Sequence, residues 1–423
     1  MEETLVFMYN PIMLFCFLDG NGQDFLNRKE GVMHKGKGCT GLNRRDFLRV
    51  GLLGTTSALL GWENLAEAMN YASSESFVFP TPIYRTLGRT GLKITVVSFG
   101  AMLTPEAEVM RVAFDHGVNY VDTARRYMGG KNEEIVAKAL KGKRDKIYVA
   151  TKTQPASKSK EAIIKDVETS LRALETDYID VIQLHNLTGK DRAFIPETRE
   201  ALVRLKEQGK VRFFGVTTHT NQAEVLHALV EDRERFFHTA LVAYNFKSGK
   251  DVTEAIARAA QANIGIIAMK TQAGGYTTGA LGPISPHQAA LKWALQNKHI
   301  TAAIPGMRDM AELREDIAVM GMRFGYLDGL ILKRYGAAVK PYYCHLCGQC
   351  EATCPKGVEI STINRCLMYA EAYRSAELAR STYYEIPSRV SASACLNCTD
   401  CVARCVHGLD IPVKMERARK LLA

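Results

Sequence analysis

Between residues 94 and 304 the chain alternates short runs of apolar or β-branched residues with longer segments in which apolar residues recur every three or four positions. The short runs predict strands, and the longer segments predict helices of roughly ten to seventeen residues. The predicted strands are Thr95–Phe99, Val118–Val121, Ile147–Thr151, Ile179–Leu184, Val211–Val216, Ala240–Ala243, Ile264–Met269 and Ala302–Ile304. Eight strand–helix units over about 230 residues favour a closed (β/α)8 barrel of parallel strands.

The predicted helix Lys160–Leu174 illustrates the helical pattern. One face of it carries Ile163, Ile164, Val167, Leu171 and Leu174. Pro196 stands where another helix can begin, and Gly209 follows its predicted end. An open, doubly wound sheet is the alternative fold. That fold calls for a glycine-rich phosphate loop after its first strand, and no GxGxxG motif is found there.

A β-hairpin is predicted before the barrel, in Tyr84-Arg-Thr-Leu-Gly-Arg-Thr-Gly-Leu-Lys-Ile94. Its two glycines suit the tight turn between short strands. We expect this hairpin to cover the floor of the barrel.

Composition narrows the class of protein. The chain has 423 residues, of which 47% are hydrophobic and 24% charged, and this balance excludes a largely disordered chain. No run approaches the ~20 uninterrupted apolar residues of a membrane span, so we expect no integral span. The net charge of +10 comes partly from the amino end and partly from bases scattered among acids. Without a basic stripe interleaved with aromatic residues, a nucleic-acid partner is not expected.

The amino end has the composition of an export signal. Residues 43–50 read Asn-Arg-Arg-Asp-Phe-Leu-Arg-Val, a mildly apolar run follows, and Ala66-Glu-Ala68 offers small residues for cleavage. With its Arg44-Arg45 pair this segment resembles a twin-arginine (Tat) signal. A basic helix beside an apolar segment is the alternative interpretation.

Met33 begins a conventional basic leader, so we expect the natural start at Met33 rather than at Met1. A used Tat signal places the protein in the periplasm or on the outer face of the cytoplasmic membrane. If the signal is not used, the protein is cytoplasmic.

Four polar residues follow the ends of three consecutive predicted strands, where barrel enzymes place their chemistry. They are Asp122, Tyr127, Lys152 and His185. A lysine ammonium beside a phenol favours the phenolate and lowers the phenol pKa from its usual ~10. An aspartate holds the lysine in place, and a histidine can hydrogen-bond a carbonyl or tune the phenol. Each residue alone has an ordinary structural role, but together they predict a proton-transfer site.

At these residues the chain resembles the aldo-keto reductase family. The similar segments are Gly117–Tyr127 with Asn132-Glu133, Ser170–Leu174, Tyr178–His185 and Gly209–Val216, in the family's order within about residues 84–320. The resemblance implies a (β/α)8 barrel that binds a nicotinamide cofactor without a Rossmann domain. It also implies that Tyr127 is the general acid for reduction of a small carbonyl substrate, or for oxidation of the matching alcohol, in a tetrad with Asp122, Lys152 and His185.

The resemblance also locates the cofactor. It implies binding by Thr217, Thr218, Asn245, Met269, Lys270, Gly306, Arg308, Glu315 and Asp316. Thr217-Thr218 replaces the family's common Ser-Asn pair, and Met269 replaces the aromatic residue that often stacks under the nicotinamide. Arg308 and Arg314 are the obvious bases for a 2′-phosphate, so NADPH and NADH both stay open.

The cysteines are clustered, because nine of the eleven lie after residue 340. The run Cys344-x2-Cys347-x2-Cys350-x3-Cys354-Pro resembles a bacterial ferredoxin motif, and Cys395-x2-Cys398-x2-Cys401-x3-Cys405 repeats it. In such pairs the fourth cysteine of each run binds the other [4Fe–4S] cluster. One predicted cluster is therefore held by Cys344, Cys347, Cys350 and Cys405, and the other by Cys395, Cys398, Cys401 and Cys354. Zinc is the alternative, although structural zinc sites favour separated CxxC pairs.

The remaining cysteines need no cluster. Cys366 is expected to be a small buried apolar residue, while Cys16 and Cys39 fall in the leader. A helix over Ile363–Ala379 is predicted between the two cysteine runs.

The predicted architecture has three parts. Residues 1–80 are a leader and linker, residues 81–335 a (β/α)8 TIM barrel, and residues 336–423 a small, mostly α-helical ferredoxin-type iron–sulfur domain. The main hypothesis is an oxidoreductase that acts on a carbonyl or alcohol and exchanges electrons with a redox partner protein through two clusters. The alternative is an electron carrier whose barrel docks partners or senses cofactor with little turnover.

Overall fold

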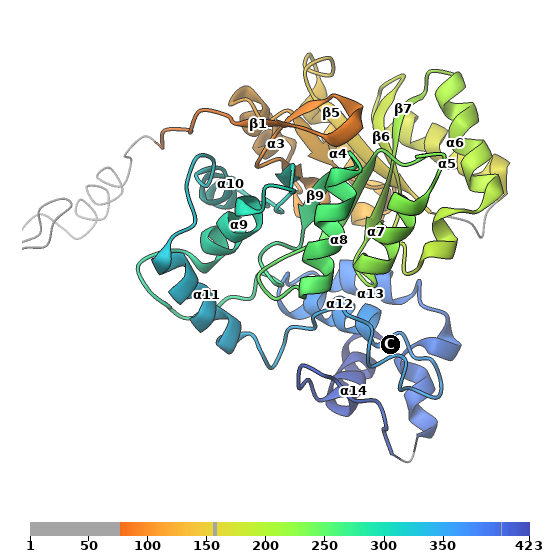
Figure 1. Cartoon of the computed structure of the whole chain (residues 1–423), viewed down its shortest axis with the longest axis vertical. Coiled ribbons are helices and arrows are strands. Elements are labelled where there is room, and N and C mark those ends of the chain that lie inside the picture. The colour runs from red at the N-terminus through yellow and green to blue at the C-terminus, as the bar shows by residue number, and fades with distance from the viewer. Residues whose placement is uncertain (1–76, 155–158, 399) are drawn as a thin grey trace, which may run out of the picture. The chain divides into compact units, whose positions relative to one another are not determined.

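Eight parallel strands form the centre of the fold in this computed structural model, which describes residues 77–154, 159–398 and 400–423 (Figure 1). They are β3 (Phe99–Gly100), β4 (Tyr120–Asp122), β5 (Tyr148–Thr153), β6 (Ile179–Leu184), β7 (Val211–Thr218), β8 (Thr239–Ala243), β9 (Gly265–Met269) and β10 (Ala302–Ala303). Each strand pairs with the next one in the sequence. Bridges between Val97 and Ala303 and between Gly100 and Gly306 join the first strand to the last, which gives the predicted (β/α)8 arrangement.

The predicted leader, with its Tat motif and both candidate start sites, lies outside the described residues. Residues Phe77–Ala423 belong to one compact unit. Within the ranges given above, the longest apolar helical stretches are too short or too polar to cross a membrane.

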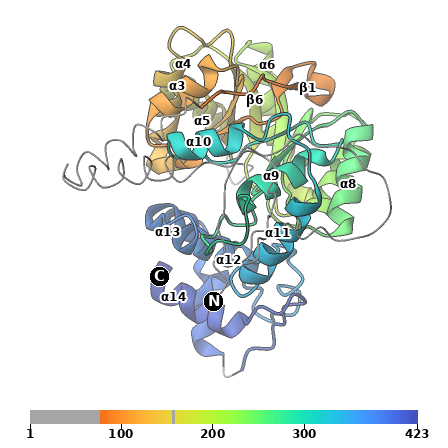
Figure 2. The same ribbon diagram turned by 90° about the vertical axis from the view of Figure 1, so that its left-hand side faces the viewer.

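Helices follow the strands and cover the outside of the sheet (Figure 2). They are α3 (Ala107–Asp115), α4 (Asn132–Leu140), α5 (Lys160–Ala173), α6 (Pro196–Glu207), α7 (Gln222–Glu231), α8 (Lys250–Gln261), α9 (Pro286–Gln296) and α10 (Met310–Ile317). The predicted helix boundaries are confirmed at two of them. Ser159 caps α5 by accepting a hydrogen bond from the Ala162 amide at 3.3 Å, and Gly209 follows α6 with a φ of +71°.

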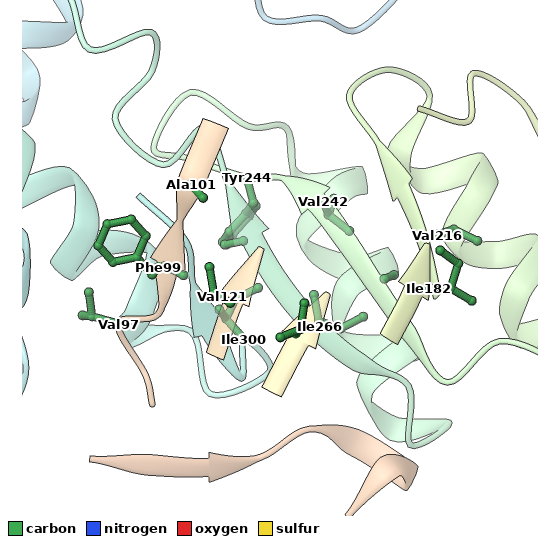
Figure 3. Close-up of a cluster of buried hydrophobic side chains, with 14 of the residues drawn as sticks. Val97, Phe99, Ala101, Val121, Ile182, Val216, Val242, Tyr244, Ile266 and Ile300 are labelled. Carbon is green, nitrogen blue, oxygen red and sulfur yellow. The ribbon is translucent and has the colours of Figure 1, made fainter. Parts of the chain in front are cut away.

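Strand residues alternate between two apolar layers. Outward side chains such as Val121, Ile182 and Val242 pack with the helices (Figure 3). Their inward neighbours fill the barrel, and Tyr120 and Val181 are among them. This alternation decides which polar residues can reach the interior, because only every second position of a strand points there.

The predicted hairpin is confirmed. Strands β1 (Tyr84–Thr86) and β2 (Lys93–Thr95) pair antiparallel, with Arg85 opposite Ile94. Leu87, Leu92 and Ile94 are buried in the same cluster as the inward barrel residues, so the hairpin covers the barrel floor. The prediction of a first barrel strand from Thr95 was wrong, because Thr95 pairs with Tyr84 in the hairpin and β3 starts only at Phe99.

The region after the barrel is helical. It contains α11 (Tyr326–Ala338), α12 (Ile360–Glu371), α13 (Ala376–Tyr383) and α14 (Ile411–Leu422). The single helix predicted over Ile363–Ala379 was wrong, since the chain ends α12 and restarts at α13. Arg374 has a φ of 53° at the break, and the Ser375 hydroxyl accepts a hydrogen bond from the Leu378 amide at the start of α13.

Candidate active site

A buried ion pair lies at the carboxyl ends of β4 and β5. Asp122 follows the inward-facing Tyr120 by two residues, and Lys152 follows the inward-facing Ala150 by two, so both side chains point into the barrel. The Lys152 ammonium donates hydrogen bonds to the Asp122 carboxylate and, over 2.7 Å, to the Thr123 carbonyl. Gln183 on β6 donates to the other Asp122 oxygen at 2.7 Å.

Gln183 was missed by the sequence analysis. It lies two residues after the inward-facing Val181 and two before His185, so strand alternation alone would have placed it inside. Its amide fixes the carboxylate that holds the lysine.

Tyr127 and His185 complete the tetrad. Tyr127 starts a 3-10 turn, Tyr127–Gly130, in the loop after β4. The Lys152 nitrogen lies 4.7 Å from the centre of the Tyr127 ring. The rings of Tyr127 and His185 lie edge to face, with centroids 6.1 Å apart. The structure thus brings the four sequence-predicted residues together at one end of the barrel.

Burial dominates the protonation of the phenol and the imidazole. It raises the pKa of Tyr127 well above 10, assisted by the negative Asp122 and opposed by the positive Arg365. The expectation that Lys152 lowers the pKa of this phenol was therefore wrong in direction, because desolvation disfavours the phenolate more than the nearby cations favour it. Burial, followed by the Lys152 and Arg365 charges, lowers the pKa of His185 well below 6.5. At neutral pH the site holds a protonated phenol and an uncharged imidazole.

Burial and the charge of the partner have opposite effects on the pKa of each residue in the ion pair. Burial raises the pKa of Asp122, and the neighbouring Lys152 charge opposes that rise. Burial lowers the pKa of Lys152, and the Asp122 carboxylate opposes that fall. Each group therefore stays charged mainly through its partner.

A second network supports the loop that holds Tyr127. Glu133 accepts from Arg125 at 2.9 Å and from the Thr151 hydroxyl at 2.6 Å. Asn132 accepts from the Thr123 hydroxyl at 2.6 Å. The Asn132-Glu133 pair thus ties α4 to the strand ends of β4 and β5.

Above the tetrad lies a cavity of about 1240 Å³. Asp122, Tyr127 and His185 line its barrel side, and Arg365, Tyr369 and Tyr373 from the region of α12 line the opposite side. The predicted substrate site lay in the barrel alone and did not include these α12 residues. No sequence signal identifies them, because hydrophobic periodicity does not say where a helix packs.

The predicted cofactor residues fall into two groups. Lining the cavity are Met269, Lys270, Gly306, Arg308, Glu315 and Asp316. Thr217, Thr218 and Asn245 are buried behind the wall. The Thr217 hydroxyl accepts from the Asn186 amide at 2.7 Å, the Thr218 hydroxyl donates to the Thr220 carbonyl at 2.7 Å, and Asn245 donates to Tyr343 at 2.8 Å.

At the cavity wall beside Thr217 and Thr218, the structure instead presents Asn186 and His219. The side-chain oxygen Oδ1 of Asn186 and His219 Nδ1 are hydrogen-bonded at 3.0 Å. The Asn186 backbone N–H donates to Thr217, and His219 follows Thr218, so both lie beside the positions where the sequence predicted contacts to the carboxamide.

The far end of the cavity has mixed charge. Arg308 donates to Glu312 at 2.8 Å from Nε, and the Ser285 hydroxyl donates to Glu315. Burial raises the pKa of Asp316 well above 3.8, and this side chain accepts from Gln272 at 3.0 Å. Beside Gly306 the space is open: a Cβ there would meet only the Leu103 side chain, at 3.9 Å. The cavity size, the exposed backbone and the adjacent arginine fit a dinucleotide.

The eight motif cysteines converge in two sets. The Cys344 thiol has its pKa raised by burial and then by Cys350, Cys347 and Cys405. Cys395 has its pKa raised by burial and then by Cys398, Cys354 and Cys401. These neighbours are the two crossed sets that the spacing predicts, and a cavity of about 990 Å³ is lined by Cys354, Cys395, Cys398, Cys401 and Cys405.

The described cysteines form no disulfide, and Cys366 is fully buried in the helical core. Across residues 77–154, 159–398 and 400–423 no three His, Cys, Asp or Glu side chains stand in metal-binding geometry. The thiols are nevertheless near enough to repel one another when ionised, and four soft thiolates per set are the donors that an iron–sulfur cluster needs.

Comparisons with known proteins agree with this geometry. Residues 103–282 match the model described as Aldo/keto reductase family. L-galactose dehydrogenase of Arabidopsis thaliana is 27% identical over 281 residues, covering 56% of this chain and 87% of that protein. The aldo-keto reductase YhdN of Bacillus subtilis is 37% identical over 149 residues, covering 33% of this chain and 43% of that protein.

Solved structures share the fold. An aldo-keto reductase from Bacillus halodurans, in its holo form, has a TM-score of 0.52 and 23% identity, covering 60% of this chain and 96% of that one. An aldo-keto reductase from Klebsiella pneumoniae in complex with NADPH has a TM-score of 0.51 and 24% identity, covering 60% of this chain and 95% of that one.

Proposed function

Because residues 103–282 match the model of the aldo/keto reductase family, we propose that this enzyme is an NAD(P)-dependent oxidoreductase that interconverts a carbonyl and an alcohol. The observation that supports it most is the protonated, half-buried Tyr127 beside the Lys152–Asp122 pair, facing a cavity large enough for cofactor and substrate.

In the reducing direction the chain supplies a proton. A bound nicotinamide supplies the hydride for the carbonyl carbon. Tyr127 Oη donates its proton to the carbonyl oxygen, which becomes the alcohol, and the phenolate left behind is stabilised by the Lys152 ammonium. Neutral His185 is free to hydrogen-bond the same oxygen and orient it. In the oxidising direction the phenolate accepts the proton of the alcohol.

NADPH is the cofactor we propose, held by Met269, Gly306 and Arg308 with the acids at the far end of the cavity. The Klebsiella pneumoniae relative of the same fold was solved with NADPH, which supports this choice. Arg308 is the base available for a 2′-phosphate, provided that it exchanges part of its contact with Glu312. Initial rates with NADPH and NADH at equal concentrations test the preference.

Replacing Tyr127 tests the proposed chemistry. We expect Tyr127→Phe to lower kcat for a panel of aldehydes and ketones by about 10²–10⁴, the usual contribution of a general acid. Tyr326→Phe is the matched control, because Tyr326 is 81% exposed and does not line the cavity. Equal rates for the wild type and Tyr127→Phe would refute the assignment of Tyr127.

We further propose that the helical region holds two [4Fe–4S] clusters. One set is Cys344, Cys347, Cys350 and Cys405, and the other is Cys395, Cys398, Cys401 and Cys354, supported by the mutual influence of the thiols within each set. Each cluster carries one electron at a time, which suits exchange with a redox partner protein.

Iron content tests the clusters without reference to activity. Anaerobically purified wild type should contain about eight iron atoms per chain, and Cys354→Ser roughly four, because one cluster loses a ligand. Cys366→Ser is the control, since none of the motif cysteines is among the groups that shift the pKa of the Cys366 thiol. Stoichiometric zinc in place of iron and sulfide would refute the proposal.

A second function is favoured by one observation. The hydroxyls of Thr217 and Thr218 and the amide of Asn245 are engaged elsewhere, so the nicotinamide has fewer polar groups to hold it. That arrangement suits an electron carrier whose barrel binds cofactor or partner with little turnover. Tight cofactor binding without carbonyl reduction supports this second function, and rapid carbonyl reduction after cluster removal excludes it.

We propose that the chain is exported by the Tat route, on the basis of the Arg44-Arg45 motif alone. Fractionation of cells that express the full chain should find it outside the cytoplasm, and Arg44→Lys with Arg45→Lys should retain it inside. Equal distribution of both forms would contradict export. Intact-mass analysis of the precursor distinguishes a start at Met33 from one at Met1.

A further inference from the structure

Arg365 is a buried cation that has no partner in the part of the chain that the structure describes. It lies on α12, is 5% exposed, and lines the cavity opposite Tyr127 and His185. Among the residues that the structure describes, none makes a hydrogen bond, an ion pair or a ring-stacking contact with its guanidinium. Its charge nonetheless affects the reacting end of the cavity, because it lowers the pKa values of Tyr127, His185 and His219.

The acids that line this cavity are engaged elsewhere. Asp122 pairs with Lys152, Glu385 with Arg126 at 2.6 Å, and Glu312 with Arg308. Glu315 accepts from Ser285, and burial raises the pKa of Asp316 so that it favours the neutral acid. The remaining lining acid, Glu359, forms no ion pair with Arg365.

Lys270 adds a second cation at the same place. Its ammonium lies 4.6 Å from the centre of the Tyr369 ring and 4.8 Å from that of Tyr373. Its hydrogen bond is to the Tyr373 hydroxyl at 3.4 Å, and no carboxylate of the described residues pairs with it. Burial and then the charge of Arg365 lower the pKa of Lys270 well below its usual 10.5, so an anion bound beside both groups would favour the ammonium form of Lys270.

A buried guanidinium without a counter-charge, with a half-buried lysine near it, is unfavourable unless an anion joins them. A guanidinium offers paired N–H donors that match the two oxygens of a carboxylate or phosphate. An ammonium beside it supplies a further donor and charge. The cavity wall therefore has the donors and the uncompensated charge of an anion site, next to the proton donor of the proposed reaction.

We propose that Arg365 and Lys270 bind a carboxylate of the substrate, so that the enzyme acts on carbonyl compounds and alcohols that carry an acidic group. This inference rests on the proposed carbonyl–alcohol function. The anion is held across the cavity from Tyr127 while the carbonyl oxygen faces the phenol. The helical region that bears the cysteines thus completes the substrate site, since the barrel alone contains Lys270 but not Arg365.

Pairs of carbonyl compounds that differ in one carboxylate test the assignment. Succinic semialdehyde against butanal and glyoxylate against acetaldehyde are suitable pairs for the full chain. We expect the wild type to favour the acid by at least about tenfold in kcat/KM, and Arg365→Gln to lose most of that preference through a higher KM. Arg389→Gln is the control, because Arg389 is exposed and does not line the cavity.

Calorimetric titration with succinate gives a readout independent of turnover. Binding to the wild type and to Arg389→Gln, and its loss in Arg365→Gln, supports the proposal. If succinate does not bind, or if Arg365→Gln weakens NADP⁺ and leaves succinate unchanged, the substrate assignment is overturned, and the second result makes Arg365 a contact of the cofactor phosphates. If neither aldehyde of a pair is reduced, the carbonyl–alcohol function fails while the titration still decides whether the anion site exists.

Discussion

The ammonium nitrogen of Lys152 lies 4.7 Å from the centre of the Tyr127 ring. The same ammonium donates to Asp122, whose carboxylate also accepts from Gln183. One lysine therefore links a buried acid to the proposed proton donor. Its charge stabilises the phenolate that forms when Tyr127 gives up its proton, and its own charge depends on Asp122.

The buried pair of Lys152 and Asp122 should contribute to the stability of the fold. Lys152→Met leaves the Asp122 carboxylate without its cation, and we expect the free energy of unfolding to fall by about 3–5 kcal/mol. The double variant Lys152→Met with Asp122→Asn removes both charges, so it should be more stable than Lys152→Met alone. Urea unfolding followed by circular dichroism measures both. Strictly additive losses would show that the two charges do not interact.

The pH dependence of activity should show no titration of His185 near pH 6.5. Burial and the surrounding cations lower the pKa of this imidazole well below 6.5, so it stays neutral at pH 6.5 and above. The proposed reduction should therefore have kcat without an acid limb near pH 6.5. A limb at that pH in the wild type that disappears in His185→Gln would contradict the neutral imidazole.

The barrel and the tetrad could be predicted because both follow from local rules. Strands such as Ile179–Leu184 are short apolar runs between helical patterns, and the structure has that strand with the same bounds. Residues at strand ends meet at one mouth whenever the strands are parallel, so Asp122, Lys152 and His185 had to converge if the fold was right.

Other parts could not be predicted, because they depend on packing between distant segments. Nothing in the pattern around Arg365 indicates that α12 brings it to the barrel mouth. The hydroxyls of Thr217 and Thr218 point to backbone partners rather than to the cavity, which depends on loop conformation. The pKa of Tyr127 was misjudged because a sequence shows neighbouring charges but not the degree of burial.

His238 should make the fold less stable in acid. Its ring packs beside Phe213 and Phe214, its Nδ1 accepts from the Phe214 amide at 3.3 Å, and burial lowers its pKa from 6.5 to about 4. Between pH 6.5 and about 4, His238 therefore binds a proton in the unfolded chain but stays neutral in the folded chain. Stability from this group is therefore complete above pH 6.5 and is lost as pH falls toward 4.

The ring of His238 is only partly buried, so we expect a loss of about 1–2 kcal/mol over that range after allowance for solvent screening. The measurement is the free energy of unfolding of the wild type and of His238→Gln at several pH values. His238→Gln should show a smaller decline between pH 6.5 and 4. Parallel pH dependence in both proteins would show that His238 does not contribute.

The hairpin below the barrel should contribute stability without affecting catalysis. Leu87 is fully buried among the inward barrel residues, and its Cδ1 lies 2.6 Å from where a Cβ on Gly265 would be, so the floor is closely packed. Leu87→Ala leaves a void there, and we expect it to lower the free energy of unfolding by about 2–5 kcal/mol. Ile83→Ala, at a 42% exposed position just before β1, should change it by less than about 0.5 kcal/mol.

Because the tetrad lies at the opposite end of the strands, Leu87→Ala should keep the wild-type kcat/KM at temperatures where it is folded. A lowered kcat/KM with unchanged stability would instead show that the hairpin acts on the site and does not support the fold.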